Sequence, residues 1–487
     1  MRIRKIAASL FTLGMAATPF AHATNGMNLS GYGPEAHAMG GASMAYDNGT
    51  AATMNNPATL GLMKEGSRVD VALGLLAPDI TAKMPTMPDA KSSATAFYMP
   101  AMGYATKVGK LSYGVGVFSQ GGMGTEYDAN SFMSAGSGLK TRSEVGVGRF
   151  IVPLAYQMDD KVTIGGSIDF VWAGMDVLMA MDGASMMDMF PTTVNPLATQ
   201  AAGTLGGSMI TTALPAMMPL MDPANPINWG YFSFSDDNKF TGKAKGNGYA
   251  AKIGFTYKLN SQITLGGTYH SKTAIGDLNA TDASVTFNAN VDAGYIATGT
   301  PNGTYTAVPI TVPGKISVKN FQWPETYGMG VAYQATDSLM VVADYKRIGW
   351  KAVMKDFKIS FTANSGLAGM TAGLSDTIMD ATLFQNWKDQ NVFQIGAAYK
   401  VDSAWTVRAG VNMANNPVPD AYMNALFPAV AKTNLSGGFG YVVNQQSSID
   451  ASFAYVPKTT VTNNSGAAPV TVDFGGYSAQ LLYSYKY

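Results

Sequence analysis

The chain has 487 residues, of which 47% are hydrophobic and only 13% are charged, and its formal net charge at pH 7 is +0. Soluble domains average about 25% charged residues, so this composition argues against an ordinary soluble protein, and its hydrophobic content argues against a disordered one. Beyond the N-terminus no run of residues approaches the roughly 18 apolar positions of a membrane helix, which leaves a β-barrel with alternating strands as the fitting architecture.

The first 23 residues are predicted to be a secretory signal peptide. Arg2, Arg4 and Lys5 form a basic start, a largely apolar stretch follows, and residues 21–23 read Ala-His-Ala, the small-residue pattern of a cleavage site. We therefore expect export from the cytoplasm and cleavage after Ala23.

The rest of the chain alternates between apolar and polar residues with a period of two, which is the pattern of β-strands with one apolar face. From Trp405 to Met413 the odd positions are apolar, whereas the even positions are small, polar or charged. The same test along the chain predicts fourteen strands, at about residues 67–77, 94–107, 110–119, 143–157, 161–175, 245–258, 261–275, 318–335, 338–350, 388–400, 403–413, 430–443, 446–457 and 472–487.

Short polar turns alternate with long segments rich in Gly, Pro and Asn between these strands. In outer-membrane barrels the short turns are periplasmic and the long loops extracellular. We therefore predict an all-β, antiparallel transmembrane β-barrel over residues 67–487, in the outer membrane of a Gram-negative bacterium. Long extracellular loops are expected at about residues 176–244, 276–317 and 351–387. The chain ends on an aromatic residue, Tyr487, which we expect the barrel-assembly machinery to read.

The longest predicted loop is rich in methionine and aromatic residues. It contains Met186, Met187, Met189, Phe190 and Trp229. Methionine is flexible and polarizable and suits varied apolar ligands, and an exposed apolar patch usually marks a binding surface. These five side chains are therefore candidates for an extracellular groove that captures an apolar ligand, with a self-packed loop cap as the alternative.

Charged side chains on the predicted strands are expected to face the lumen, because a Lys or Arg that faces lipid at the midplane costs about 2–4 kcal/mol. Arg149, Arg408, Lys252 and Lys346 take such inward positions. Arginine binds a carboxylate through a bidentate fork, so the two arginines are the first candidates for holding a carboxylate ligand, and the two lysines the next. The alternative is that these cations cross-link the lumen in ion pairs.

The sequence contains no recognisable catalytic, cofactor or metal-binding motif. It has no cysteine, and His37 and His270 lie far apart, which argues against a transition-metal site. It has no Gly-x-Ser-x-Gly motif and no glycine-rich phosphate loop, and no basic run indicates nucleic acid. We therefore expect no enzyme activity, no cofactor and no nucleic-acid partner.

Four short motifs follow one another along the chain: Ala38-Met39-Gly40-Gly41-Ala42, Asn55-Asn56-Pro57-Ala58, Trp323-Pro324-Glu325-Thr326-Tyr327 and Asn416-Pro417-Val418-Pro419-Asp420. Their order and spacing, together with the fourteen strands, resembles the FadL family of outer-membrane transporters for long-chain fatty acids and hydrocarbons. The resemblance implies a fourteen-stranded barrel whose lumen is plugged by an N-terminal hatch, here residues 24–66. It also implies an extracellular apolar groove, and a kink in the third strand that opens the wall so that substrate leaves sideways into the outer leaflet.

The resemblance places a hatch motif at Asn56, Pro57 and Ala58, near the kinked strand. Proline fixes its backbone and lacks an N–H, and asparagine can hold a turn through its side chain; a plain loop turn is the alternative. Glycine inside a strand marks a bulge or bend, so Gly114 and Gly116 in the predicted third strand are the kink candidates. Small residues that merely face the lumen are the alternative for these two glycines.

The function expected from these features is passive transport of a hydrophobic small molecule across the outer membrane. A long-chain fatty acid is the first expectation, and a neutral aromatic or aliphatic hydrocarbon carried by the same fold is the alternative. An open general porin or a surface adhesin is the alternative from another class. We expect the protein to be a monomer surrounded by outer-membrane lipid.

Overall fold

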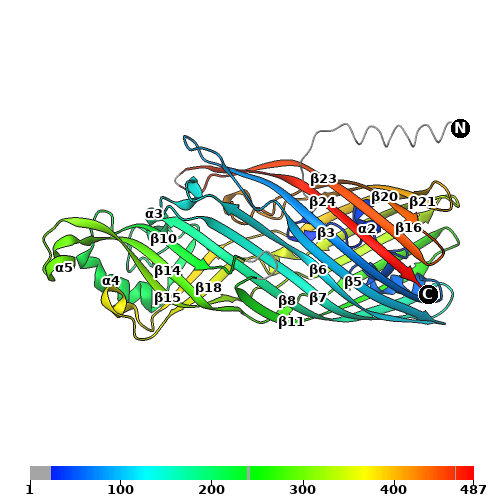
Figure 1. The fold of residues 1–487 in the computed structure, drawn as a ribbon, viewed down its shortest axis with the longest axis horizontal. Coiled ribbons are helices and arrows are strands. Elements are labelled where there is room, and N and C mark those ends of the chain that lie inside the picture. The colour runs from blue at the N-terminus through cyan, green and yellow to red at the C-terminus, as the bar shows by residue number, and fades with distance from the viewer. Residues whose placement is uncertain (1–23, 238–241, 467) are drawn as a thin grey trace.

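The computed structural model describes residues 24–237, 242–466 and 468–487. The predicted signal peptide, residues 1–23, lies outside the described residues. In the described part of the chain, no helix is both long enough and apolar enough to cross a membrane. The fold is dominated by long, tilted antiparallel strands that curve round an interior (Figure 1).

Fourteen of the described strands are hydrogen-bonded in a closed ring. Each pairs with the next, and the last, β24, pairs with the first, β3, along almost its whole length. Because lipid offers no hydrogen-bond partners, a sheet that spans a membrane must close on itself, and the predicted barrel is confirmed. The ring strands are β3 (Gly66–Lys83), β5 (Phe97–Val108), β6 (Leu111–Tyr127), β7 (Thr141–Gln157), β8 (Val162–Asp182), β11 (Ala244–Lys258), β12 (Ile263–His270), β16 (Thr326–Gln334), β17 (Leu339–Ile348), β20 (Gln390–Lys400), β21 (Trp405–Ala414), β22 (Thr433–Val442), β23 (Ser447–Asn463) and β24 (Val470–Lys486).

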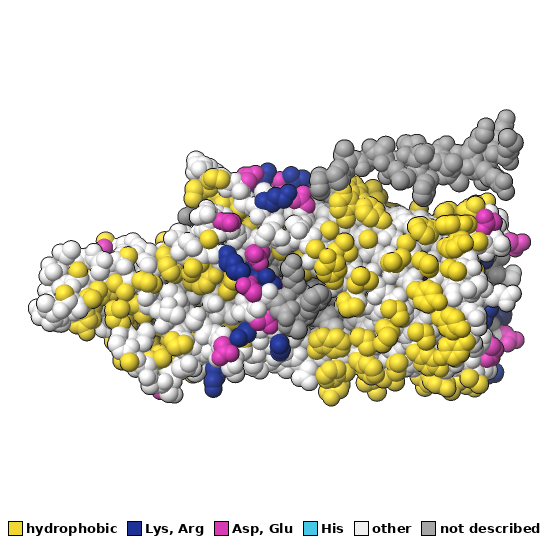
Figure 2. Space-filling model, viewed as in Figure 1, with side chains coloured by type: hydrophobic (Ala, Val, Ile, Leu, Met, Phe, Trp, Pro, Cys, Tyr) yellow, Lys and Arg dark blue, Asp and Glu magenta, His cyan; other side chains and the backbone are white. Residues whose placement is uncertain are grey.

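Side chains on these strands alternate between the lipid face and the lumen. On β8 the Ile168 side chain is 69% exposed, whereas its neighbour Asp169 is completely buried. Figure 2 shows apolar side chains covering the half of the molecule that holds the C-terminus, up to a band of charged side chains. This division matches an apolar belt in contact with lipid and charged residues where the wall leaves it.

The wall is uneven in height. β3 has 18 residues and β8 has 21, whereas β12 has 8 and β16 has 9. All the tight hairpins lie at one rim, which is the periplasmic rim by the orientation rule for outer-membrane barrels. The opposite, extracellular rim is therefore high along β3, β6, β7 and β8 and low along β12, β16 and β17.

The segments predicted as long loops are folded into a second part of the sheet, at the left of Figure 1, and this corrects the expectation of irregular loops. Its strands pair in the order β8, β10, β14, β15, β18, β19, β9. A period-two pattern is present there as well. Val285, Phe287 and Ala289 stand at alternate positions, and all three are buried on one face of the sheet. The elements of this region and the extracellular rim are β4 (Ala90–Lys91), η3 (Phe132–Ser134), α3 (Gly183–Asp188), β9 (Gly203–Gly206), η4 (Met209–Ala213), α4 (Leu214–Met217), η5 (Met218–Leu220), β10 (Ile227–Phe234), β13 (Ala274–Ile275), β14 (Leu278–Asp292), α5 (Ala293–Thr298), β15 (Tyr305–Lys319), η6 (Trp350–Ala352), β18 (Asp356–Ala363), η7 (Gly369–Leu374), β19 (Ile378–Phe384) and η8 (Asp420–Tyr422).

The N-terminal segment from residue 24 to residue 65, here called the hatch, packs against the lumen face of the wall. In α2 the buried His37 places its Nδ1 2.9 Å from Ser452 Oγ and its Nε2 2.7 Å from Ser478 Oγ, on β23 and β24. On the opposite side, the Asp344 carboxylate of β17 accepts from Ser43 N at 2.6 Å. The hatch elements are β1 (Thr24–Asn25), β2 (Asn28–Leu29), α2 (Pro34–Ala38), η1 (Gly49–Thr53) and η2 (Pro57–Leu62).

Glycines on the lumen face let the hatch backbone approach the wall closely. A Cβ added at Gly396 or Gly410 would overlap the main chain of Met39, and one at Gly254 would overlap the Asn56 side chain. These small residues are therefore part of the docking surface for the hatch.

We predict that Gly410→Ala loosens the hatch, because the added methyl group would overlap Met39 and Gly40. Overpacking of this kind costs about 1–3 kcal/mol. Gly437→Ala, on the neighbouring strand β22, is the matched control, since the nearest heavy atom to its added Cβ is 3.5 Å away. In planar bilayers Gly410→Ala should conduct more ions than the wild type and the control. Equal conductance of all three proteins would contradict this close contact.

Candidate functional site

The barrel wall separates between β5 and β6. Their pairing begins at the hairpin, where Val108 faces Leu111, and ends where Ala101 faces Phe118. Beyond that point residues 97–100 of β5 pair with β3, while β6 continues along β7. Two neighbouring strands of the ring therefore part in their extracellular halves.

An extra residue in β6 marks the start of this separation. Along β7 the register is regular up to Ser119, which faces Gly148, and it then shifts so that Gly121 faces Val147. Gln120 is the extra residue, and such a bulge bends the strand that contains it.

The kink thus lies in the third strand of the ring, but at neither of the two predicted glycines. Gly114 faces Ala105 and Gly116 faces Gly103, in the regular part of the ladder. Both glycines point into the lumen, where a Cβ at Gly116 would approach the hatch residue Thr53 at 3.0 Å. Their position matches the alternative of small residues on a lumen face.

The N-terminal hairpin of the hatch lies against β6 at the bulge. Asn28 pairs with Gly121, and Gly122 N donates to Met27 O at 3.0 Å. Asn28 is held in turn by Trp323, whose Nε1 donates to Asn28 Oδ1 at 2.6 Å. The hatch therefore supplies backbone partners to β6 where β5 has moved away.

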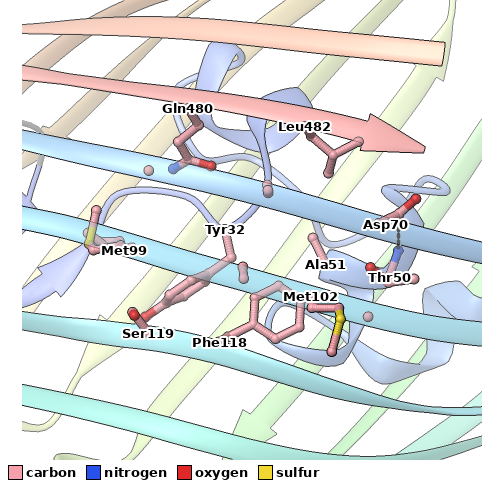
Figure 3. Close-up of a pocket in the computed structure, with 16 residues that line it drawn as sticks. Tyr32, Thr50, Ala51, Asp70, Met99, Met102, Phe118, Ser119, Gln480 and Leu482 are labelled. Carbon is pink, nitrogen blue, oxygen red and sulfur yellow. Dashed lines mark hydrogen bonds between the residues drawn. The ribbon is translucent and has the colours of Figure 1, made fainter. Parts of the chain in front are cut away.

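Side chains supply further hydrogen-bond partners along the edge of β6 that β5 leaves unpaired. Tyr32 of the hatch donates from its hydroxyl to Gln120 O at 2.6 Å, and Figure 3 shows its ring reaching toward β6 beside Phe118. Further along, Glu126 N donates to Ser92 Oγ at 3.1 Å. An unpaired edge in a membrane is costly, so these contacts stabilise the separation.

A cavity of about 660 Å³ lies at the separation, with lining residues on both faces of the wall. Cavities of this size hold small-molecule ligands. Glu144 and Lys245 are the charged residues in its lining, and most of the remainder is apolar or glycine. The large apolar and aromatic lining residues include Phe97, Tyr98, Met99, Pro100, Met123, Val145, Val147, Trp172 and Phe474.

Next to this cavity, the hatch packs closely against the wall, and only a small hollow remains between them. Figure 3 shows the hollow that remains there, about 30 Å³, between Tyr32 and Thr50 of the hatch and Met99 and Met102 of the wall. In it Thr50 N donates to the Asp70 carboxylate at 2.8 Å. Such a volume holds no more than about two water molecules, so the described hatch closes the lumen at this point.

Two of the predicted lumen cations hold the hatch. Arg408 Nη1 lies 2.7 Å from Asp450 of the wall, and its Nη2 lies 3.1 Å from Glu35 of the hatch. Lys346 Nζ donates to Gly41 O of the hatch at 3.2 Å. Both cations therefore join the hatch to the wall.

The other two cations cross-link the wall beside the bulge. Arg149 Nη1 lies 2.8 Å from the buried Asp169 carboxylate, and Arg149 Nε donates to Gln120 Oε1 at 2.5 Å. Lys252 Nζ pairs with the same carboxylate of Asp169. None of the four predicted cations lines the cavity at the separation. Arg149, Lys252 and Arg408 form internal ion pairs, which matches the alternative. Lys346 instead donates to a backbone carbonyl of the hatch.

The motif Asn56-Pro57-Ala58 lies at the start of η2, which packs against β7, β8 and β11. Asn56 Oδ1 accepts from Ala58 N at 3.1 Å, and Pro57 follows as the first residue of η2. Asn56 Nδ2 donates to Met44 O at 2.8 Å and to Phe255 O, on β11, at 3.0 Å. The motif therefore caps a turn of the hatch and ties it to the wall.

The five residues predicted to form an extracellular groove pack within the extracellular region. Met186, Met189 and Phe190 are fully buried there, and Met187 and Trp229 are half-buried. Trp229 lies on β10, between β8 and β14. This location differs from an open groove and matches the alternative of a self-packed cap.

Gln120 and the hairpin residues Met27 and Asn28 are functional-site residues that the sequence did not predict. The signal for the bulge was weak: alternation simply fails along Gln120-Gly121-Gly122. Among the described residues, no three acidic or histidine side chains gather closely enough to hold a metal ion.

Comparisons with known proteins agree with this architecture. A sequence model of the family described as outer membrane protein transport protein (OMPP1/FadL/TodX) matches residues 12–481. The crystal structure of the P. putida toluene transporter TodX is 26% identical with a TM-score of 0.76, covering 94% of this chain and 99% of that one. The long-chain fatty acid transport protein of Escherichia coli O6:H1 is 22% identical over 393 residues, 80% of this chain and 76% of that protein.

A curated relative from Chlorobium limicola, an uncharacterized protein, is 52% identical over 99 residues, and this chain spans about half, 48%, of its length. The family match, by contrast, extends over nearly the whole chain and accompanies a closed barrel with an apolar belt. The chain therefore belongs to the FadL/TodX family of outer-membrane transport proteins and resides in the Gram-negative outer membrane.

Proposed function

We propose that this protein carries small neutral hydrocarbons, of the size of a substituted benzene, passively through the separation between β5 and β6 into the outer leaflet. The lining of the 660 Å³ cavity carries the proposal: it is largely apolar, and Arg149, Arg408, Lys252 and Lys346 are all outside it. A carboxylate cargo needs a cation on its path, whereas a neutral cargo needs only apolar surface. The P. putida relative, named a toluene transporter, supports the same cargo class.

The hydrophobic effect supplies the driving force in this proposal. Apolar cargo gains about 25 cal/mol for each Å² removed from water, so it partitions from water into the apolar cavity and from there into lipid. No energy source is needed for movement down such a gradient. The hatch contacts argue against an open porin, and because the named relatives are transporters we infer no catalytic activity.

A long-chain fatty acid is the second candidate cargo, and one observation favours it. Lys245 lines the cavity, and its exposed side chain forms no hydrogen bond or ion pair with the residues that the structure describes. An ammonium group there could hold a carboxylate while the alkyl chain occupies the cavity. The fatty acid thus stays a prediction.

Assembly and oligomeric state also stay predictions. Tyr487 N donates to Ser67 O at 3.0 Å and Ser67 N donates to Tyr487 O at 2.8 Å, so the final residue lies at the seam that closes the ring. Recognition of this residue by the assembly machinery fits that position, and a monomer is expected because the ring closes within one chain.

Deleting Gln120 should close the separation, because the register with β7 then becomes continuous. Uptake of radiolabelled toluene, by cells that lack other channels of this family, should fall to the level of cells without the gene. Gln120→Ala keeps the extra backbone residue and should retain most of the uptake. Full uptake by the deletion variant, with a normal amount of folded protein in the outer membrane, would exclude this route.

Arg408→Ala should weaken hatch docking, because it leaves the carboxylates of Asp450 and Glu35 without their cation. Breaking a buried pair costs about 3–5 kcal/mol, so protease should cut the hatch faster, and toluene uptake should change together with hatch protection. Arg347→Ala, which breaks an exposed pair with Asp389, is the control and should change neither. Selective loss of oleate uptake with normal hatch protection would instead make Arg408 a cargo ligand.

The two cargo classes can be compared directly in cells with and without the gene. We expect the protein to raise toluene uptake and to leave oleate uptake at the background rate. The opposite result would favour the fatty acid, and Lys245→Ala should then reduce oleate uptake. Lys315→Ala is the matched control, because Lys315 is an exposed lysine on β15 that lies outside the cavity lining.

A further inference from the structure

A second cavity lies at the low part of the extracellular rim. Three segments line it: residues 272–274 after β12, residues 319–322 from the end of β15 toward β16, and residues 352–358, which run from the segment after β17 into β18. Its volume is about 410 Å³, and it shares no lining residue with the cavity at the β5–β6 separation. It is therefore a separate hollow with its own set of lining residues.

The lining of this cavity is strongly basic. It contains four lysines, which are Lys272, Lys319, Lys355 and Lys358, and one acidic residue, Asp356. All four lysines are exposed, so their ammonium groups are accessible from outside. This excess of positive charge calls for an anion from outside the chain.

Acidic residues of the protein neutralise only part of that charge. Lys319 Nζ lies 2.9 Å from Asp277, and this hydrogen bond lowers the pKa of the Asp277 carboxyl. Lys358 Nζ lies 4.0 Å from Asp356. Lys272 and Lys355 form no side-chain hydrogen bond or ion pair with any residue in the described ranges.

Two tyrosines near the cavity indicate that it lies at the level of the lipid head groups. Tyr269, three residues before Lys272, and Tyr327 face outward with their ring centroids 4.9 Å apart. Aromatic girdles of this kind mark the membrane–water interface. Below them the outer wall is apolar, and Met329, two residues further along β16, is 62% exposed. A molecule in the cavity can therefore extend an apolar portion along the wall.

We propose that this basic cavity, lined by Lys272, Lys319, Lys355 and Lys358, binds the phosphorylated head group of an outer-leaflet lipid. Phosphate offers several strong acceptors and more than one negative charge, and lysine meets phosphate as a compact point charge. The low rim at β12, β16 and β17 brings the lysines to the head-group level, and the apolar wall beneath accepts acyl chains. The site is independent of cargo transport, since it shares no lining residue with the proposed route.

The probe for this site is fluorescent diphosphoryl lipid A, titrated with the full-length mature protein in a non-ionic detergent. Dephosphorylated lipid A and inorganic phosphate serve as competitors. Lys272→Gln/Lys355→Gln removes the two lysines that have no partner. Lys351→Gln/Lys388→Gln is the matched control, because it removes the same charge from exposed lysines at the same rim that do not line the cavity.

We expect the first double variant to raise the apparent Kd for diphosphoryl lipid A by at least about tenfold, and the control to change it less than about twofold. Wild-type binding should weaken with added salt, and dephosphorylated lipid should compete poorly. Equal affinity of the wild type and both double variants would overturn the site. Displacement by inorganic phosphate as effective as that by the lipid would overturn its assignment to lipid. Toluene uptake should be normal in all variants, which separates this test from that of the transport route.

Discussion

A sheet that spans a membrane must satisfy its backbone hydrogen bonds within the protein, and this constraint organises the whole structure. The ring meets it by closing β24 onto β3. At one place, between β5 and β6, neighbouring strands separate, and the hatch supplies the missing partners through Met27 and Tyr32. The separation is therefore a stable part of the fold, because it is built together with the element that occupies the lumen. The separation in the wall and the closed lumen follow from the same set of contacts.

The buried cations of this barrel hold the hatch and the bulge of β6 in position. Arg408 and Lys346 join the hatch to the wall, and Arg149 connects the bulge at Gln120 to Asp169. These partners leave the cavity at the separation largely free of charge. The electrostatics of the lumen thus agree with the proposed preference for uncharged cargo, while Lys272 and Lys355, which have no side-chain partner among the described residues, lie at the extracellular rim.

The sequence predicted the barrel well because the alternation of apolar and polar residues along each strand is a local pattern. It can be recognised without knowing which strands pair. Alternation such as that from Trp405 to Met413 reflects one lipid face and one lumen face, and it located most strands of the ring to within a few residues. It missed the long extracellular extensions, and it made the strands at 261–275 and 318–335 longer than β12 and β16 are. The bulge at Gln120 could not be located in this way, because it is defined by register against β7, a second segment of chain. Gly114 and Gly116 carried a stronger local signal, but their reason is contact with the hatch and the neighbouring strand.

The roles of individual site residues depended on partners that are distant in sequence. Arg408 faces inward as predicted, yet its function was decided by Glu35 and Asp450. Met186 and Phe190 were identified as a dense apolar group, but their burial depends on strands of the extracellular region that the sequence analysis treated as loops. Composition and period therefore revealed which residues are unusual, and the tertiary contacts determined what each of them does.

The most direct test of the route is a crystal structure of the protein soaked with 4-bromotoluene, with bromine located by its anomalous scattering. We predict a bromine peak inside the 660 Å³ cavity, between Phe97 of β5 and Val147 of β7. A peak confined to the extracellular region around Met186, or to the lumen beside Arg408, with none at the β5–β6 separation, would contradict the proposed route.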